Sequence, residues 1–131
     1  MTTALGGDQR APSRPQLWRV TNRAAFAALR RNGQRGRCGP LSVTWLAPAP
    51  GAPIEPPRVA FAIGRAAGGA VLRNRIRRRL RAGLRELQSA GRLPSGSYLL
   101  GANAKLARLP WTEVLATLEE ALLAATSRSP R

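Results

Sequence analysis

One segment near the middle of the chain, residues 70–87, constrains the fold more than any other. Its apolar residues recur every three or four positions, which is the period of an α-helix with one buried face. These residues are Leu72, Ile76, Leu80, Leu84 and Leu87. They fall within an arc of roughly 120°, so the segment predicts a helix that packs on a sheet. Gly83 lies inside this helix and costs about 1 kcal/mol relative to Ala.

The other residues of this segment are rich in arginine. Seven of the thirteen residues at 73–85 are arginine, and no acidic residue occurs before Glu86. Solvent-exposed helix faces usually mix acids and bases, because like charges one turn apart, such as Arg73 and Arg77, destabilise a helix. Phosphates would relieve this repulsion and accept paired hydrogen bonds from guanidinium groups. We therefore favour polyanion binding over an ordinary solvated face.

The charge of the whole chain agrees with this interpretation. Its 131 residues carry 22 basic and 6 acidic side chains, a formal net charge of +16. A GC-rich genome would explain why every base except Lys105 is arginine, but it does not explain the scarcity of acids. So large a charge implies a polyanionic partner, and we favour nucleic acid. Binding to an acidic membrane would need a lipid anchor or a helix with bulky apolar residues opposite the basic face.

The residue types also limit the chemistry of the chain. Cys38 is the only cysteine and histidine is absent, which rules out an internal disulfide and effectively excludes a zinc site. Protein nucleases commonly use clustered carboxylates or a histidine, whereas the acids here are scattered. We therefore expect no catalytic residues, and a partner would carry out any reaction. The lack of a long apolar segment or a signal peptide predicts a cytoplasmic protein.

The ends of the chain differ from its centre. Residues 1–16 and 126–131 lack periodicity and are rich in Pro, Ser or Arg. They predict a disordered basic N-terminal arm and a disordered tail, which flank a single domain at residues 17–125.

The segments around the central helix predict one small α+β fold. Thr21 or Asn22 would cap a first helix that ends near Gly33, and Pro110 would help to begin a last helix. Strands are predicted at residues 41–47, 59–63 and 98–102, and a further short strand could form at 33–39. Five prolines make residues 48–57 a stiff loop. The order α-β-β-(β)-α-β-α is typical of an α+β sandwich with helices on one small sheet.

Two other features bear on ligand binding, and each leaves two interpretations open. The glycine-rich residues 64–69 would let the backbone approach a phosphate at a helix N-terminus, or form only a turn and a helix cap. Phe26, Trp45 and Phe61 could stack on bases of single-stranded RNA, although core packing is favoured for each one alone. Two more aromatic residues, Trp18 and Trp111, are interpreted as packing residues.

Residues 58–87, RVAFAIGRAAGGAVLRNRIRRRLRAGLREL, resemble the signature of the bacterial ribonuclease P protein component family. The shared pattern is a strand, a short basic turn and a helix that opens with Arg73-Asn74-Arg75. Phe26 with Gly33, together with the strands near 41–46 and 98–102, extends the resemblance over about residues 17–125. It implies a two-layer α-β sandwich that is ribosomal protein S5 domain 2-like, with a left-handed β-α-β crossover. General handedness rules predict the right-handed form.

The resemblance also implies a partner and a substrate. The protein would bind the ribonuclease P RNA subunit and the 5′ leader of precursor tRNA, and the RNA, with magnesium ions, would hydrolyse the phosphodiester. The protein alone would bind no cofactor and would need neither a membrane nor an obligate protein partner. The implied RNA-binding residues are Arg65, Arg73, Asn74, Arg75, Arg77, Arg78 and Arg79. The sheet face with Phe26, Trp45 and Phe61 would line the cleft for the leader.

Three residues depart from the family pattern. Ala66 follows Arg65 where the family usually has a second basic residue, so one phosphate contact would be missing. Gly69 replaces an Asn, a change that costs a helix cap only about a few tenths of a kcal/mol. Arg30 stands where a second aromatic residue often occurs on the first helix, which weakens the stacking hypothesis.

Two other functional classes share the charge of this chain. A structural RNA-binding protein, such as a ribosomal protein, would share the charge and the fold. A DNA-compacting protein would bind duplex DNA as well as structured RNA. The nucleic acid that the protein binds would distinguish these classes.

Overall fold

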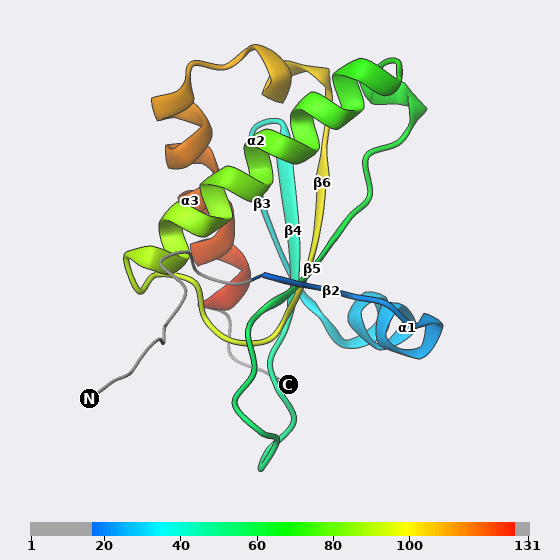
Figure 1. The fold of residues 1–131 in the computed structure, drawn as a ribbon, viewed down its shortest axis with the longest axis vertical. Coiled ribbons are helices and arrows are strands. Elements are labelled where there is room, and N and C mark those ends of the chain that lie inside the picture. Colours follow the sequence, from blue (N-terminus) through cyan, green and yellow to red (C-terminus); the bar gives the residue numbers. More distant parts are fainter. Residues whose placement is uncertain (1–16, 128–131) are drawn as a thin grey trace, which may run out of the picture.

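A mixed five-stranded sheet forms the centre of the computed structural model, which describes residues 17–127 (Figure 1). The strands are β2 (Trp18–Arg19), β3 (Gln34–Cys38), β4 (Leu41–Leu46), β5 (Arg58–Phe61) and β6 (Ser97–Ala102). Their order in the sheet is β2-β5-β6-β4-β3. Strand β5 is parallel to its neighbours β2 and β6, and strand β4 is antiparallel to its neighbours β6 and β3. The optional strand at 33–39 is confirmed as β3. Strand β2 was not predicted, because two residues are too short to show a period.

Three α-helices and two 3₁₀ turns complete the fold. They are α1 (Arg23–Asn32), η1 (Arg65–Ala67), α2 (Ala70–Ser89), η2 (Ala104–Arg108) and α3 (Trp111–Thr126). Asn22 is the N-cap of α1, and its Oδ1 accepts a hydrogen bond from the amide of Ala25 over 2.7 Å. Helix α3 continues through Thr126, one residue into the predicted tail. The predicted arm at 1–16 and the last four residues lie outside the described residues.

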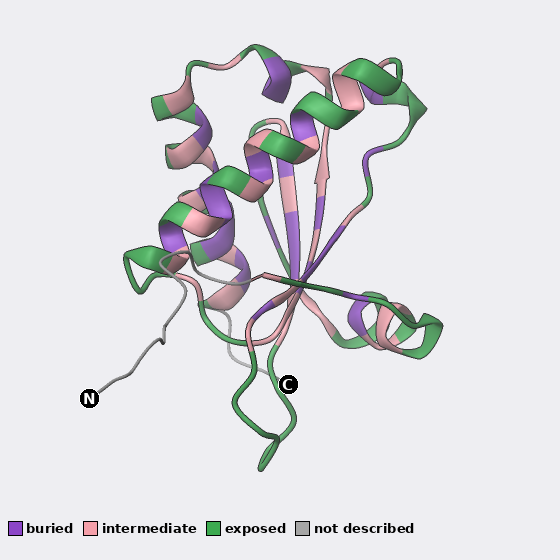
Figure 2. Ribbon diagram, in the orientation of Figure 1, coloured by how far each residue is buried: buried purple, intermediate pink, exposed green. Residues whose placement is uncertain are grey.

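The helices cover different faces of the sheet. Helices α2 and α3 pack on one face, where Ile76, Leu80 and Leu118 meet Val43 and Leu100 in the main core. Helix α1 packs on the opposite face, in a smaller cluster with Leu29, Val20 and Ala60. Figure 2 shows buried and exposed residues alternating along α2, as the periodicity at 70–87 predicted. The α+β prediction is confirmed, and the structure adds that α1 lies apart from the other two helices.

Strand β5, helix α2 and strand β6 form a β-α-β unit, because the two strands are parallel neighbours. In Figure 1, α2 lies in front of the sheet, both strands run upward, and β6 lies to the left of β5 above their crossing. This arrangement is the left-handed crossover that the family resemblance implied and that general rules disfavour. It places the N-terminal turn of α2 directly after η1, at the end of the sheet where β5 finishes.

Two glycines allow α3 to pack closely on its neighbours. A Cβ atom on Gly83 of α2 would lie 2.8 Å from Cδ2 of Leu118 in α3. A Cβ atom on Gly36 of β3 would lie 2.4 Å from the amide nitrogen of Ala125 and 2.5 Å from the carbonyl oxygen of Ala121. Gly83, which the sequence marks only as a weak helix former, is therefore a close-packing residue between two helices.

Candidate RNA-binding surface

The outer surface of α2 is defined by the exposed residues Val71, Asn74, Arg75 and Arg78. Val71 is 82% exposed although it is apolar, and it lies in the first turn of the helix. No acidic residue occurs in this first turn. A helix N-terminus carries a partial positive charge, and the nearby arginines add to it. The result is a positively charged surface at the start of α2.

Asn74 and Arg77 interact with each other on α2. Nη1 of Arg77 donates a hydrogen bond to Oδ1 of Asn74 over 2.9 Å. The amide oxygen of Asn74 therefore already has a partner within the protein. Its NH₂ group retains two donors, and the bond restricts the conformations that the Arg77 side chain can adopt.

Arg79 and Arg75 hold the 3₁₀ turn η2 against α2. Nη1 of Arg79 donates to the carbonyl oxygen of Leu106 over 2.7 Å, and its Nη2 donates to the carbonyl oxygen of Leu109. Nε of Arg75 donates to the carbonyl oxygen of Ala107 over 3.2 Å. Burial, with a smaller effect of the nearby Arg75 charge, lowers the pKa of Arg79 below its usual value. Arg79 is thus engaged in the fold, and its assignment to RNA binding stays an untested prediction.

Arg81 covers the ring of Phe61. The guanidinium carbon of Arg81 lies 5.5 Å from the ring centroid, within cation-π range. Burial, and then the charges of Arg85 and Arg19, lower the pKa of Arg81 from its usual value. Phe61 is therefore partly covered by a side chain of the same protein and offers little free ring surface.

The glycine-rich turn before α2 contains η1 and two functionally different glycines. Gly68 has φ +130°, a conformation that residues with a Cβ atom rarely adopt. Gly69 is the N-cap of α2 and makes no side-chain cap bond. Arg65 is exposed on η1, and Arg73 is half-buried in the first turns of α2. The structure shows a turn and a helix cap at this segment, and phosphate binding there stays a prediction.

The three candidate stacking residues do not share one face of the sheet. Phe26 belongs to the α1 side, where it packs against the small cluster that contains Leu29 and Ala60. Trp45 and Phe61 pack against the main core under α2 and α3. Successive side chains of a strand alternate between faces, so Trp45 lies opposite its neighbour Leu46. The predicted cleft lined by all three rings is therefore wrong, and only Phe26 remains on the α1 face.

Trp45 also has a polar partner. Its indole Nε1 donates a hydrogen bond to the carbonyl oxygen of Ser95 over 3.0 Å. The ring is half-buried against the main core, and the bond connects β4 with the segment that precedes β6. This geometry is typical of a packing residue whose N–H group needs a partner.

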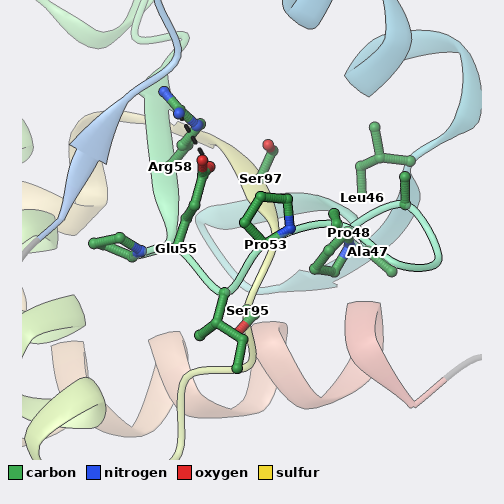
Figure 3. Close-up of a pocket in the computed structure, with 13 residues that line it drawn as sticks. Leu46, Ala47, Pro48, Pro53, Glu55, Arg58, Ser95 and Ser97 are labelled. Carbon is green, nitrogen blue, oxygen red and sulfur yellow. Dashed lines mark hydrogen bonds and ion pairs between the residues drawn. The ribbon is translucent and has the colours of Figure 1, made fainter.

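A pocket of about 350 Å³ lies beside the proline-rich loop (Figure 3). It is lined by parts of residues 46–58 and 95–97, and the Arg58–Glu55 ion pair forms one of its walls at 3.1 Å. The guanidinium of Arg58 also lies 4.8 Å from the ring centroid of Trp18 on β2. The sequence did not indicate this stacking, because the two residues are 40 positions apart. None of the predicted RNA-binding residues lines this pocket.

Within residues 17–127, no three His, Cys, Asp or Glu side chains come together as metal ligands. Glu119 pairs with Arg92, and Glu120 accepts a hydrogen bond from the thiol of Cys38 over 3.3 Å. In the same part of the chain, no helix is both long and apolar enough to cross a bilayer.

Comparison with known proteins identifies related sequences. The family model described as Ribonuclease P matches residues 15–126. A ribonuclease P protein component from Thermobifida fusca (strain YX) is 41% identical over 113 residues, which cover 82% of this chain and 76% of the relative. The corresponding protein from Brucella suis is 31% identical over 125 residues, which cover 88% and 85%.

Solved structures show the same fold. The RNase P protein from Staphylococcus aureus superimposes with a TM-score of 0.69 at 20% identity, covering 83% of this chain and 95% of the other. The RNase P protein from Thermotoga maritima gives a TM-score of 0.66 at 20% identity, covering 79% and 94%. The α-β fold implied by the sequence signature is therefore confirmed.

Proposed function

The chain belongs to the ribonuclease P protein component family, and we propose that it binds the ribonuclease P RNA subunit through the outer surface of α2. The family makes it part of a ribonucleoprotein endonuclease that acts in tRNA processing. The proposal adds which surface contacts the RNA. It assigns the contacts to Arg73, Arg75 and Arg78 of α2 and to Arg65 on the preceding turn. Arg77, which Asn74 orients, adds a further contact.

The observation that carries this proposal is the set of unneutralised arginines on α2. Among the described residues the salt bridges are Arg58 with Glu55 and Arg92 with Glu119, and neither involves α2. The first turn of α2 contains no acid, and its cap supplies no side chain. Phosphates are the ligands that would relieve this repulsion and accept guanidinium hydrogen bonds.

We assign the 5′ leader of precursor tRNA to the α1 face of the sheet, opposite α2. Phe26 is half-buried on this face. Arg35 and Arg37 of β3 are exposed and pair in register with Thr44 and Ser42, whose side chains alternate away from the main core. An aromatic ring and arginines on the same face of a sheet are a suitable surface for single-stranded RNA. The sequence missed both arginines because β3 has no hydrophobic period.

Hydrolysis of the phosphodiester is assigned to the RNA subunit and magnesium ions. The described carboxylates are scattered or already paired, so they do not fit a protein site for catalytic magnesium. The protein would instead raise substrate affinity and screen phosphate repulsion. It would do so without a cofactor of its own, a membrane or an obligate protein partner.

Reconstitution tests this function. The protein is added to a transcribed bacterial ribonuclease P RNA, and cleavage of precursor tRNA is measured at low magnesium, where phosphate repulsion is poorly screened. We expect a large gain in cleavage at the mature 5′ end. A protein that binds the RNA without any gain would instead be a structural RNA-binding protein. Equal binding to duplex DNA in competition would indicate a DNA-compacting protein.

A further inference from the structure

The turn η2 separates its apolar residues from its basic ones. Leu106 is fully buried and Ala107 nearly so, whereas Lys105 and Arg108 are exposed. A 3₁₀ helix has three residues per turn and rises about 2 Å per residue, so side chains at i and i+3 project from the same side about 6 Å apart. Lys105 and Arg108 therefore form a pair of cations on one edge of the turn.

Both ends of η2 are held in place by side chains. Oδ1 of Asn103 accepts a hydrogen bond from the amide of Lys105 over 3.0 Å at the start of the turn. At its end, the carbonyl oxygens of Leu106 and Leu109 accept from Arg79, and that of Ala107 accepts from Arg75. Carbonyls at the end of a helical turn have no partner within the turn, and cations satisfy them well. The two exposed cations are thus displayed on a preorganised segment.

The charges around η2 have no compensating acid. Neither Lys105 nor Arg108 takes part in an ion pair within residues 17–127, and η2 itself contains no acidic residue. Arg75 is exposed and uses only its Nε towards η2, which leaves its two terminal nitrogens available. Arg75 is hydrogen-bonded to Ala107, which precedes Arg108 in the chain, so it links the two cations of η2 to the outer surface of α2.

We propose that Lys105 and Arg108, together with Arg75, form a second site for the phosphodiester backbone of RNA, and that Arg79 is the positioning residue that holds this site. The proposal rests on the function proposed above and extends it to the same RNA partner. Lysine and arginine contacts to phosphate do not discriminate between bases, so the η2 site should add affinity without sequence preference. The turn has no exposed bulky apolar residue, which disfavours a membrane as its ligand.

The test measures how binding to a transcribed bacterial ribonuclease P RNA depends on salt. The wild-type protein is compared with Lys105→Ala/Arg108→Ala and with a matched control, Arg23→Ala/Arg31→Ala, which removes two exposed arginines from α1. Each lost phosphate contact should lower the log–log slope by about 0.7 to 0.9. We expect the η2 variant to lose between about one and two units, and the control to keep the wild-type slope. An unchanged slope in the η2 variant, or an equal loss in the control, overturns the site.

The role of Arg79 is tested with Arg79→Lys, which keeps the charge but cannot reach two carbonyl oxygens with a planar fork. Hydrogen exchange in the free protein should accelerate at residues 105–109 and stay unchanged in the strands. Arg79→Lys should lower the RNA affinity of the wild-type protein. It should not lower the affinity of the Lys105→Ala/Arg108→Ala variant any further. An equal loss in both backgrounds would show that Arg79 acts on RNA independently of η2, which overturns the positioning role.

These outcomes can be separated from failure of the general function. A wild-type protein that neither binds the ribonuclease P RNA nor improves its cleavage contradicts both proposals. A different result is that the wild-type protein binds the RNA and improves its cleavage while the Lys105→Ala/Arg108→Ala variant keeps the wild-type salt slope. That result overturns the η2 site alone.

Discussion

Asn74 accepts a hydrogen bond from Arg77 within the first two turns of α2, with 2.9 Å between Oδ1 and Nη1. The asparagine of the arginine-asparagine-arginine signature therefore orients a third arginine. Restricting a long side chain before binding reduces the entropy lost when it contacts RNA. This relationship predicts an indirect role for Asn74 in RNA binding.

Asn74→Ala should weaken binding to the ribonuclease P RNA by about two- to tenfold, the value of one ordinary hydrogen bond. The salt slope should not change, because no charge is removed. A double-mutant cycle with Arg77→Ala checks the mechanism, since Asn74→Ala should have little effect once Arg77 is absent. If the losses of binding free energy from the two substitutions add up in the double variant, Asn74 contacts RNA directly.

Replacing Arg73 and Arg75 by alanine should weaken RNA binding and flatten its salt dependence. Each lost phosphate contact removes up to about one unit of the log–log slope. Filter binding or fluorescence titration over a range of KCl concentrations measures this slope. A slope equal to that of the wild-type protein would show that neither arginine contacts phosphate.

Replacing Phe26 and replacing Trp45 should have different effects, because the two rings lie on opposite faces of the sheet. Phe26→Ala should reduce affinity for precursor tRNA that carries a 5′ leader, by about 1 to 3 kcal/mol if the ring stacks on a base, and should spare leaderless tRNA. The measurement is the dissociation constant of the reconstituted holoenzyme for each RNA. Equal losses for both RNAs would assign Phe26 to the core alone.

Trp45→Ala should act mainly on stability. It removes a half-buried ring and the hydrogen bond to Ser95, and we expect a loss of about 3 kcal/mol in the free energy of unfolding. Urea unfolding followed by circular dichroism measures this loss. A stable variant with selective loss of leader binding would contradict this expectation.

Gly36→Ala should destabilise the protein by about 3 kcal/mol or more, because the new methyl group would clash with the backbone of α3 at Ala125 and Ala121. Backbone atoms cannot move aside as a flexible side chain does. Gly64→Ala is the matched control, since its Cβ atom would meet no atom within 4 Å. Its free energy of unfolding should stay within about 0.5 kcal/mol of wild type.

Cys38 should react slowly with alkylating reagents. Burial, and then the hydrogen bond to the Glu120 carboxylate and its negative charge, raise the pKa of the Cys38 thiol above its usual value. Glu120→Gln should lower this pKa and speed alkylation by iodoacetamide at pH 8. Because the pKa of the thiol is raised in the folded state, any contribution to stability is present below the pKa of the unfolded chain. It is lost as the pH rises through the folded-state pKa. An alkylation rate that does not respond to Glu120→Gln would contradict the assigned cause.

Local patterns predicted most of the elements of this fold. The apolar period at 70–87 identified α2, because a helix that lies on a sheet must bury every third or fourth residue. Asn22 and the proline-rich loop at 48–57 were also predicted, since capping and proline geometry act within a few residues. The sequence signature further implied the left-handed crossover.

Local patterns could not predict the contacts between residues that lie far apart in the sequence. Arg79 appears in the sequence as one more basic residue of α2, yet it donates hydrogen bonds to carbonyl oxygens 27 and 30 positions away. Phe26 and Trp45 both appear as candidate stacking residues, and only the strand register and the placement of α1 put them on opposite faces.

The sequence by itself determined that this chain is a basic α+β protein with an arginine-rich helix, because charge and periodicity are properties of neighbouring residues. The tertiary structure decided which of those arginines face solvent and which hold the protein together. That division depends on where β6 and η2 come to lie beside α2, and this in turn depends on the packing of the whole sheet.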